Sequence, residues 1–280
     1  MSECDVYEVY AVCYAVRRDR MRWENYIASG LTDPVHDQLE PLAYFVWALR
    51  NDERTIVVDT GFDAAEAERR HEASGKVWTC DYGRSPAEGL KMMGIDSREV
   101  NDVIVTHLHY DHAGTLYDFP RAQFHLQEAE VQYATGPHMT QGFLSSAYTV
   151  DHVVEVVRNV FQRRVVFHHG DDSVAPGVTV HHIGGHTMGI QCVRVKTQFG
   201  WLVLASDVSH FYGNFEDRAP FPIVYNVADM LRGFERLEAL AGPGGRIIPG
   251  HDPLVLTRYP AWSSATQDIV VRLDVDQKMK

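Results

Sequence analysis

The chain has 280 residues, of which 45% are hydrophobic, enough for one large buried core, and we expect a single domain over residues 1–280. A formal charge of −12 argues against a nucleic-acid partner, and no apolar run reaches the roughly 18–20 residues that a membrane span requires. Residues 1–5 are acidic and lack the basic and apolar regions of a signal peptide, so we expect a cytoplasmic protein with no membrane partner.

The first half of the chain alternates between expected strands and helices. Residues 6–16 are β-branched and aromatic and predict a strand, whereas the polar, turn-rich residues 17–41 predict a long loop or a partly helical lid. Asp63 is a good cap for an alanine- and glutamate-rich helix. The remaining expected elements are a hairpin of 44–49 and 55–58, helices at 63–74 and 86–93, strands at 103–105 and 123–126, and helices at 127–134 and 153–161.

The second half contains another run of strands followed by one long helix. Apolar residues in 226–240 recur at helical spacing, which indicates a helix packed on the core. We expect strands at 165–167, 178–182, 192–195, 201–205 and 246–248. Because the strands come in two runs, each mixed with helices, the pattern predicts an α/β fold of two mixed β-sheets with helices on the outer faces.

The most unusual part of the sequence follows the apolar strand 103–105. It reads His-Leu-His-Tyr-Asp-His, so His107, His109, Asp111 and His112 lie within six residues. A loop at the end of a strand is a usual place for chemistry on a rigid scaffold, and all four side chains are metal ligands. We therefore predict a metal site here.

Three further strand ends carry side chains of the same kind. His186 lies between glycines after the strand 178–182, Asp207 follows 201–205, and His251 follows 246–248. Five imidazoles and two carboxylates suit two divalent ions of the zinc type, with Mn, Fe or Co as alternatives, and the four scattered cysteines are not needed. Two such ions, roughly 3.5–4 Å apart, can share a carboxylate and a readily deprotonated water.

The combined pattern resembles the metallo-β-lactamase superfamily, which implies an αββα sandwich with a dinuclear site at one edge of its two sheets. By this resemblance, Asp207 bridges the two ions, the first being held by His107, His109 and His186, and the second by Asp111, His112 and His251. The turn Asp59-Thr60-Gly61 is similar to an early turn of the superfamily. Asp59 either orients a ligand histidine or is a plain turn residue.

Within the superfamily, the sequence resembles the quorum-quenching N-acyl homoserine lactonases. This implies hydrolysis of a small-molecule lactone or ester by a metal-bridging hydroxide, with Asp207 or Asp111 passing a proton to the ring alkoxide, and it allows a homodimer. Those lactonases carry a tyrosine three residues after the bridging aspartate, where this chain has His210. Either Tyr212 or His210 would then help to hold the oxyanion.

Two classes of alternative function remain. One is another hydrolase of the same fold, acting on a γ-lactone, another cyclic ester or a thioester. The other is a non-catalytic metal-binding or sensor protein, against which the complete set of seven ligands argues. For the lactonase, we expect Phe211 and Tyr212 to line the substrate pocket, with a place in the local core as the alternative. Residues 17–41 either cover an apolar tail or form a packed loop.

Overall fold

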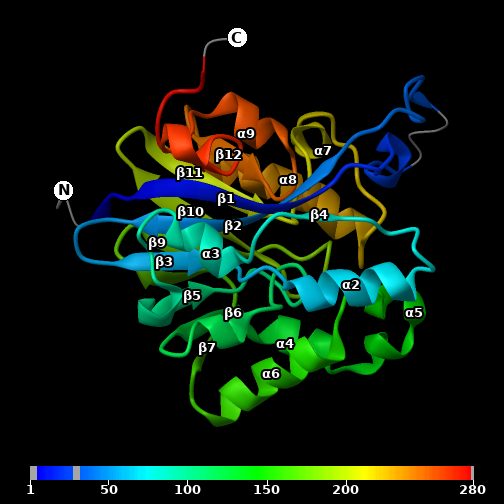
Figure 1. Ribbon diagram of the computed structural model, residues 1–280, viewed down its shortest axis with the longest axis horizontal. Helices are drawn as coiled ribbons and strands as arrows, with labels where there is room; N and C mark the ends of the chain where they lie inside the picture. The colour runs from blue at the N-terminus through cyan, green and yellow to red at the C-terminus, as the bar shows by residue number, and fades with distance from the viewer. Residues whose placement is uncertain (1–4, 28–31, 279–280) are drawn as a thin grey trace.

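Two mixed β-sheets form the centre of the protein in the computed structural model, which describes residues 5–27 and 32–278 (Figure 1). The first sheet has the order β13-β1-β2-β3-β5-β6-β7, with β4 paired to β1, and the second has the order β12-β11-β10-β9-β8. Within these described ranges, no helix is long and apolar enough to cross a bilayer.

The first sheet is antiparallel on one side and parallel on the other. The pairs β3–β5, β5–β6 and β6–β7 are parallel, and the remaining pairs are antiparallel. Its strands are β1 (Glu8–Arg17), β2 (Leu42–Arg50), β3 (Thr55–Val58), β4 (Asp81–Tyr82), β5 (Asp102–Ile104), β6 (Gln123–Gln127), β7 (Val165–His168) and β13 (Val270–Arg272).

In the second sheet, only β11 and β12 are parallel. Its strands are β8 (Asp172–Ala175), β9 (Val178–His182), β10 (Gln191–Thr197), β11 (Gly200–Ser206) and β12 (Arg246–Pro249). Because β3 and β5 run parallel in one sheet and β11 and β12 in the other, the loops after the two strands of each pair leave from the same edge of their sheet.

Helices and short 3₁₀ turns connect the strands. Asp63 caps α2 as expected, because its side chain accepts a hydrogen bond of 2.8 Å from the backbone N–H of Glu66. The helices are α2 (Ala64–Ala73), α3 (Pro86–Lys91), α4 (Glu128–Ala134), α5 (Gly142–Ser145), α6 (Val150–Phe161), α7 (Tyr212–Glu216), α8 (Val227–Ala241) and α9 (Leu254–Arg258). The 3₁₀ turns are Arg22–Glu24, Ser97–Glu99, Leu116–Asp118, Pro137–Thr140 and Ser264–Thr266.

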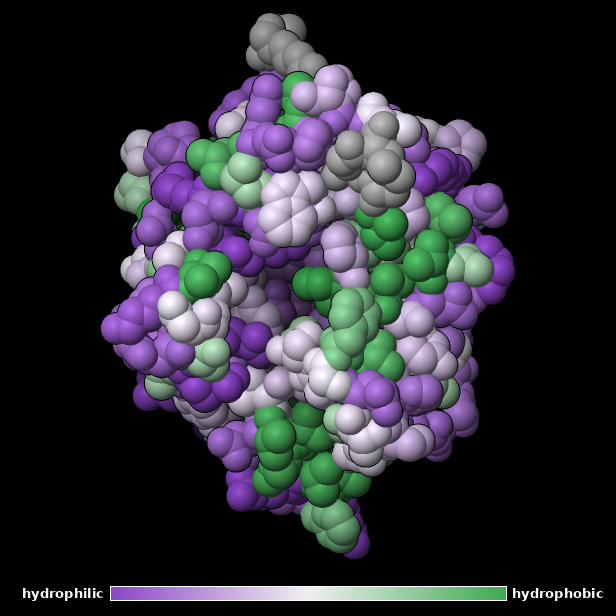
Figure 2. Space-filling model, turned by 90° about the vertical axis from the view of Figure 1, so that its right-hand side faces the viewer, coloured by the Kyte–Doolittle hydropathy of each residue, from purple (hydrophilic) through white to green (hydrophobic). Residues whose placement is uncertain are grey.

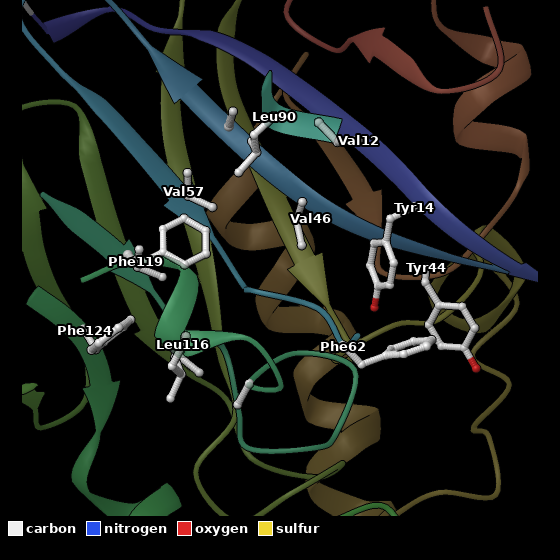
Figure 3. Close-up of a cluster of buried hydrophobic side chains, with 14 of the residues drawn as sticks. Val12, Tyr14, Tyr44, Val46, Val57, Phe62, Leu90, Leu116, Phe119 and Phe124 are labelled. Atoms are coloured by element: carbon white, nitrogen blue, oxygen red, sulfur yellow. The ribbon is translucent and has the colours of Figure 1, made fainter. Parts of the chain in front are cut away.

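Three layers of buried side chains hold the fold together. On β1, Val12 and Tyr14 belong to a cluster that also contains Leu90 of α3, and Figure 3 shows Tyr14, Tyr44 and Phe62 grouped at one end of this cluster. The alternate residues of β1 join a second cluster, shared with β9, β10 and β11, that lies between the sheets. A third cluster joins β10 and β11 to α8. The expected αββα sandwich is therefore confirmed.

Every strand and helix expected from the sequence is present, with ends that differ by three residues or fewer. The short elements β4, β8, β13, α5, α7 and α9 were not expected. β4 lies in residues 75–85, which the sequence alone indicates to be irregular, and it forms because Tyr82 and Asp81 pair with β1. β13 pairs with β1 from the far end of the chain, a contact that local sequence does not encode.

Apart from Arg17, which ends β1, and Thr32, which is helical, the described residues of segment 17–41 form a loop, with one 3₁₀ turn at Arg22–Glu24 and a bridge between Met21 and Leu39. Its residues 28–31 lie outside the described part of the chain. Tyr26 is buried and packs against Phe211, with ring centroids 6.2 Å apart. Phe211 therefore packs in the first core cluster, which is the alternative that the sequence left open beside a pocket wall.

Candidate metal centre

Four strand ends bring the predicted ligands, and a fifth brings Asp59, to one edge shared by the two sheets. From the first sheet, the loop after β5 carries His107 to His112 and the loop after β3 carries Asp59. From the second sheet come His186 after β9, Asp207 after β11 and His251 after β12. The hydroxyls of Thr106 and Ser206 are 2.8 Å apart, so the two sheets are hydrogen-bonded directly beside the ligands.

The seven side chains form two groups, all of them buried. His107, His109, His186 and Asp207 have ligand atoms within 4.8 Å of one another, and so do Asp111, His112 and His251. Asp207 reaches both groups: its Oδ2 is 3.3 Å from His186 Nε2, and its Oδ1 is 3.0 Å from His251 Nε2. One carboxylate oxygen thus faces each group, as a bridging ligand requires.

Hydrogen bonds on the far side of the rings fix three of the imidazoles. The Nδ1 atoms of His186 and His251 lie 2.7 and 2.8 Å from the carbonyl oxygens of Ile223 and Ala43. His112 Nδ1 lies 2.7 Å from the carboxylate of Asp59. Each Nδ1–H donates outward, so each Nε2 atom faces the centre. The interpretation of Asp59 as a group that orients a ligand histidine is confirmed.

Burial and neighbouring charges set the protonation of these groups. Burial lowers the pKa of His107 and of His109 well below the usual histidine value, and adjacent imidazoles lower both further, so both rings are neutral. Burial alone would raise the pKa of Asp207, but the imidazoles of His251, His210 and His112 outweigh it and hold that pKa well below its usual range. Neutral imidazole and ionised carboxylate are the forms that bind metals. His112 differs: burial would lower its pKa, but Asp207, Asp111 and Asp59 outweigh burial and raise that pKa well above the usual histidine value, so a bound metal ion would displace its proton.

The donor set fits a pair of divalent ions. His107 Nε2 is fully buried and has no hydrogen-bond partner among the described residues, and an unsatisfied buried nitrogen of this kind costs about 1–3 kcal/mol. A metal ion bound to it would remove that cost. No cysteine within residues 5–27 and 32–278 joins the clusters, so the donors are nitrogen and oxygen only, which suits Zn, Mn, Fe or Co.

Glu130 supports the first group and was not predicted. Its buried carboxylate accepts from the backbone N–H of Leu108 (3.0 Å) and from the hydroxyl of Thr187 (2.6 Å), and these residues adjoin three of the ligand histidines. It also accepts from the Tyr148 hydroxyl (2.8 Å) and the Gly189 N–H (3.1 Å). One carboxylate on α4 therefore ties together the loops of both sheets.

The structure separates the two residues considered as oxyanion helpers. His210 is buried beside the ligands, with its Nε2 2.8 Å from Asp207 Oδ2. Tyr212 begins α7 and packs in the core between the sheets, where its ring lies 3.7 Å below the guanidinium of Arg258. The expectation that Tyr212 lines the substrate pocket is wrong, because the first turn of α7 directs its ring into the core.

A small pocket of about 40 Å³ opens beside two of the ligands. It is lined by His109 and His186 together with the mostly apolar residues Tyr133, Phe143, Leu144, Ser146, Ala147, Ile223 and Val224. Figure 2 shows the end of the molecule at which α2 and α5 lie in Figure 1; its surface is hollowed near the centre, and hydrophobic side chains gather beside the hollow.

Gly250 allows β11 and β12 to bring their ligands close together. A Cβ atom at this position would lie 2.7 Å from Asp207 Oδ1 and 2.7 Å from the backbone of Ser206, so Gly250→Ala must displace the bridging carboxylate. We expect this variant to bind less than two equivalents of metal, measured by elemental analysis. The control is Gly142→Ala, where a Cβ would meet no atom of the described structure within 4 Å. Full metal content in Gly250→Ala would show that the close approach is not required.

Comparison with known proteins agrees with this geometry. The N-acyl homoserine lactonase AttM of Rhizobium johnstonii is 27% identical over 188 residues, which cover 66% of this chain and 68% of that protein. An N-acyl homoserine lactonase of Bacillus cereus is 27% identical over 187 residues, covering 64% and 69%. A probable metallo-hydrolase of Mycobacterium tuberculosis is 24% identical over 242 residues, covering 75% and 72%.

Solved structures share the fold. A quorum-quenching N-acyl homoserine lactone lactonase superimposes with a TM-score of 0.71 at 23% identity, covering 90% of this chain and 94% of that one. An N-acyl homoserine lactone hydrolase with N-hexanoyl-L-homoserine at its catalytic metal centre gives 0.72 at 22% identity, covering 88% and 94%. The family profile of the metallo-beta-lactamase superfamily matches residues 39–252. The chain therefore belongs to the metallo-beta-lactamase superfamily, as a metal-dependent hydrolase.

Proposed function

We propose that this protein is a dinuclear-metal lactonase that opens N-acyl homoserine lactones. The observation that carries the proposal is the division of the Asp207 carboxylate between two buried ligand groups, which is the arrangement that water activation by two metals requires. The lactonase names of the curated relatives support the choice of substrate. We take zinc as the metal, one of the four ions that the nitrogen and oxygen donors suit.

The residues of the site have separate tasks in this reaction. Two divalent ions, when bound, would lower the pKa of a shared water and polarise the lactone carbonyl. Asp207 spans both groups, and both of its carboxylate oxygens have imidazoles beside them. We therefore assign it a role in holding the two groups together rather than in proton transfer. Asp111 Oδ2 is 3.5 Å from His251 Nε2, at the edge of the second group. We assign to Asp111 the transfer of a proton to the departing ring alkoxide.

The small apolar pocket beside His109 and His186 supports an acylated lactone as substrate. Phe143 and Leu144 of α5 form one side of it and Ile223 forms another, so an acyl chain there would bury apolar surface next to the metal ligands. This assigns the chain-binding role to α5 and the loop before α8, whereas the sequence had indicated residues 17–41 and Phe211.

The direct test measures metal content and lactone opening on the purified protein. We expect two equivalents of metal, acid release from N-acyl homoserine lactones, and loss of that activity after chelation, with recovery on adding Zn²⁺. Full activity in the metal-free protein would refute the metal mechanism. Opening of simple γ-lactones or thioesters, with no effect on acylated homoserine lactones, would refute the substrate and favour another hydrolase of the superfamily.

Phe143→Ala tests the pocket itself. The Phe143 side chain is 69% exposed, so its removal opens the pocket wall without disturbing the core. We expect KM for a hexanoyl homoserine lactone to rise about tenfold, the effect of losing one apolar contact surface, while the constants for unacylated γ-butyrolactone stay within a factor of two. Phe161→Ala, at the exposed end of α6 and outside the pocket lining, is the matched control. Equal effects on both substrates would contradict this placement of the acyl chain.

A further inference from the structure

His210 lies between the two ligand groups without being one of the seven predicted ligands. Its ring contacts His186 of the first group at 5.3 Å and His251 of the second at 4.9 Å between centroids, nearly edge-on in both cases. The side chain is buried, and its Nε2 is 2.8 Å from Asp207 Oδ2. The ligand atoms of Asp207, His210 and His251 also lie within 4.8 Å of one another, so His210 is either a further metal ligand or a hydrogen-bond donor.

The short distance to Asp207, together with the stacking of the His210 ring, favours the role of a hydrogen-bond donor. Two ligand atoms, each roughly 2.0–2.2 Å from one tetrahedral ion, lie about 3.4 Å apart. Asp207 is 3.3 Å from His186 Nε2, 3.3 Å from His112 Nε2 and 3.0 Å from His251 Nε2, and the first two distances are close to that spacing. The 2.8 Å to His210 is instead the length of a hydrogen bond from nitrogen to a carboxylate. Because a carboxylate oxygen only accepts, Nε2 of His210 carries the proton.

The His210 ring is held in this orientation. It stacks on the fully buried ring of Phe221, with centroids 3.7 Å apart and planes 21° from parallel. Its backbone carbonyl accepts a 2.9 Å hydrogen bond from the N–H of His251, so the main chain is also tied to a ligand loop. The stack on Phe221 and the hydrogen bond from Nε2 together hold the N–H on Asp207 rather than toward a substrate.

We propose that His210 is a positioning residue, which donates from Nε2 to Oδ2 of Asp207 and thereby keeps one carboxylate oxygen on each ligand group. The hydrogen bond occupies one lone pair of Oδ2 and leaves the other for the first group. It also opposes rotation of the carboxylate to bind a single ion through both oxygens. This inference rests on the proposed dinuclear centre. It removes His210 as the oxyanion donor, the role that the sequence had left open.

Metal binding by three purified proteins tests this assignment: wild type, His210→Phe and His210→Gln. The phenylalanine keeps a ring on Phe221 without a donor, whereas the glutamine amide offers an N–H at a similar reach. Competition with a chromogenic zinc chelator measures the dissociation constant of each of the two Zn²⁺ ions. We expect His210→Phe to weaken binding of one ion by about 10–100-fold and His210→Gln to restore most of it.

Each other outcome overturns the inference. If His210→Phe binds both ions as wild type does but turns over lactone slowly, His210 is an oxyanion donor. If His210→Gln loses the ion as completely as His210→Phe, the imidazole is a ligand. Should His210→Phe fail to fold, Phe221→Leu, which removes the stack and keeps the imidazole, is expected to weaken the same ion; unchanged binding there contradicts the inference. A wild-type protein that binds two ions but opens no lactone refutes the proposed function alone.

Discussion

Asp207→Ala is expected to lose at least about 10³-fold in kcat/KM for lactone opening, and to bind at most one metal ion. Both ligand groups depend on this carboxylate, since its two oxygens are 3.3 Å from His186 and 3.0 Å from His251. A metal pair stabilises the transition state by several kcal/mol. Losing about 4 kcal/mol of that stabilisation lowers the rate by about 10³-fold. Steady-state kinetics and elemental analysis of the same preparation measure the two effects.

The matched control for this variant is Asp52→Ala. Asp52 is exposed in the turn between β2 and β3 and belongs to neither ligand group, so metal content and rate should match those of wild type. If Asp207→Ala retained two ions, a carboxylate bridge between the groups would be excluded. Retention of the wild-type rate would show that the reaction does not use this site.

Glu130→Ala is expected to lower the free energy of unfolding by at least about 3 kcal/mol, and to weaken the first metal site. The change leaves three buried donors and one partly buried donor without their acceptor, among them the N–H of Leu108 and the hydroxyl of Thr187. Each unsatisfied buried group costs about 1–3 kcal/mol. Urea unfolding of the metal-free protein measures the stability, and zinc titration measures the site.

Glu128→Ala, on the same helix, provides the comparison. Its side chain is 40% exposed and pairs with His169 at the surface, so we expect a change within about 0.5 kcal/mol and normal zinc binding. Similar losses in both variants would mean that α4 is sensitive to any substitution, and that the four hydrogen bonds of Glu130 have no special part in holding the ligand loops.

The ligands could be predicted from the sequence because the signals are local. The apolar strands β5, β9, β11 and β12 are each followed within a few residues by a histidine or aspartate ligand. Strands that run in the same direction bring such side chains to one edge of a sheet. Asp59 was recognisable for the same reason, since it directly follows β3, the neighbour of β5. The αββα layering followed from two runs of strands mixed with helices.

Contacts between distant parts of the chain could not be predicted in this way. Glu130 has the sequence surroundings of an ordinary helix residue, and only the packing of α4 against the glycine loop at Gly189 reveals its role; a Cβ there would lie 2.1 Å from the Glu130 backbone nitrogen. The sequence did not show which of His210 and Tyr212 lies beside the ligands. That depends on where α7 begins, because its first turn places the Tyr212 ring in the core. β13 depended on pairing with β1 across some 260 residues.

The shared edge of the two sheets has a consequence for the integrity of the sandwich. Each ligand group takes side chains from both sheets: His107 and His186 in the first, His112 and His251 in the second. An ion would therefore bind with full affinity only while the two sheets are docked. Its binding free energy would add to the free energy needed to separate the sheets. At a free ion concentration one hundred times the dissociation constant, that contribution is about 2.7 kcal/mol for each ion. Two bound ions would therefore stabilise the docking of the two sheets, to an extent that depends on the free metal concentration.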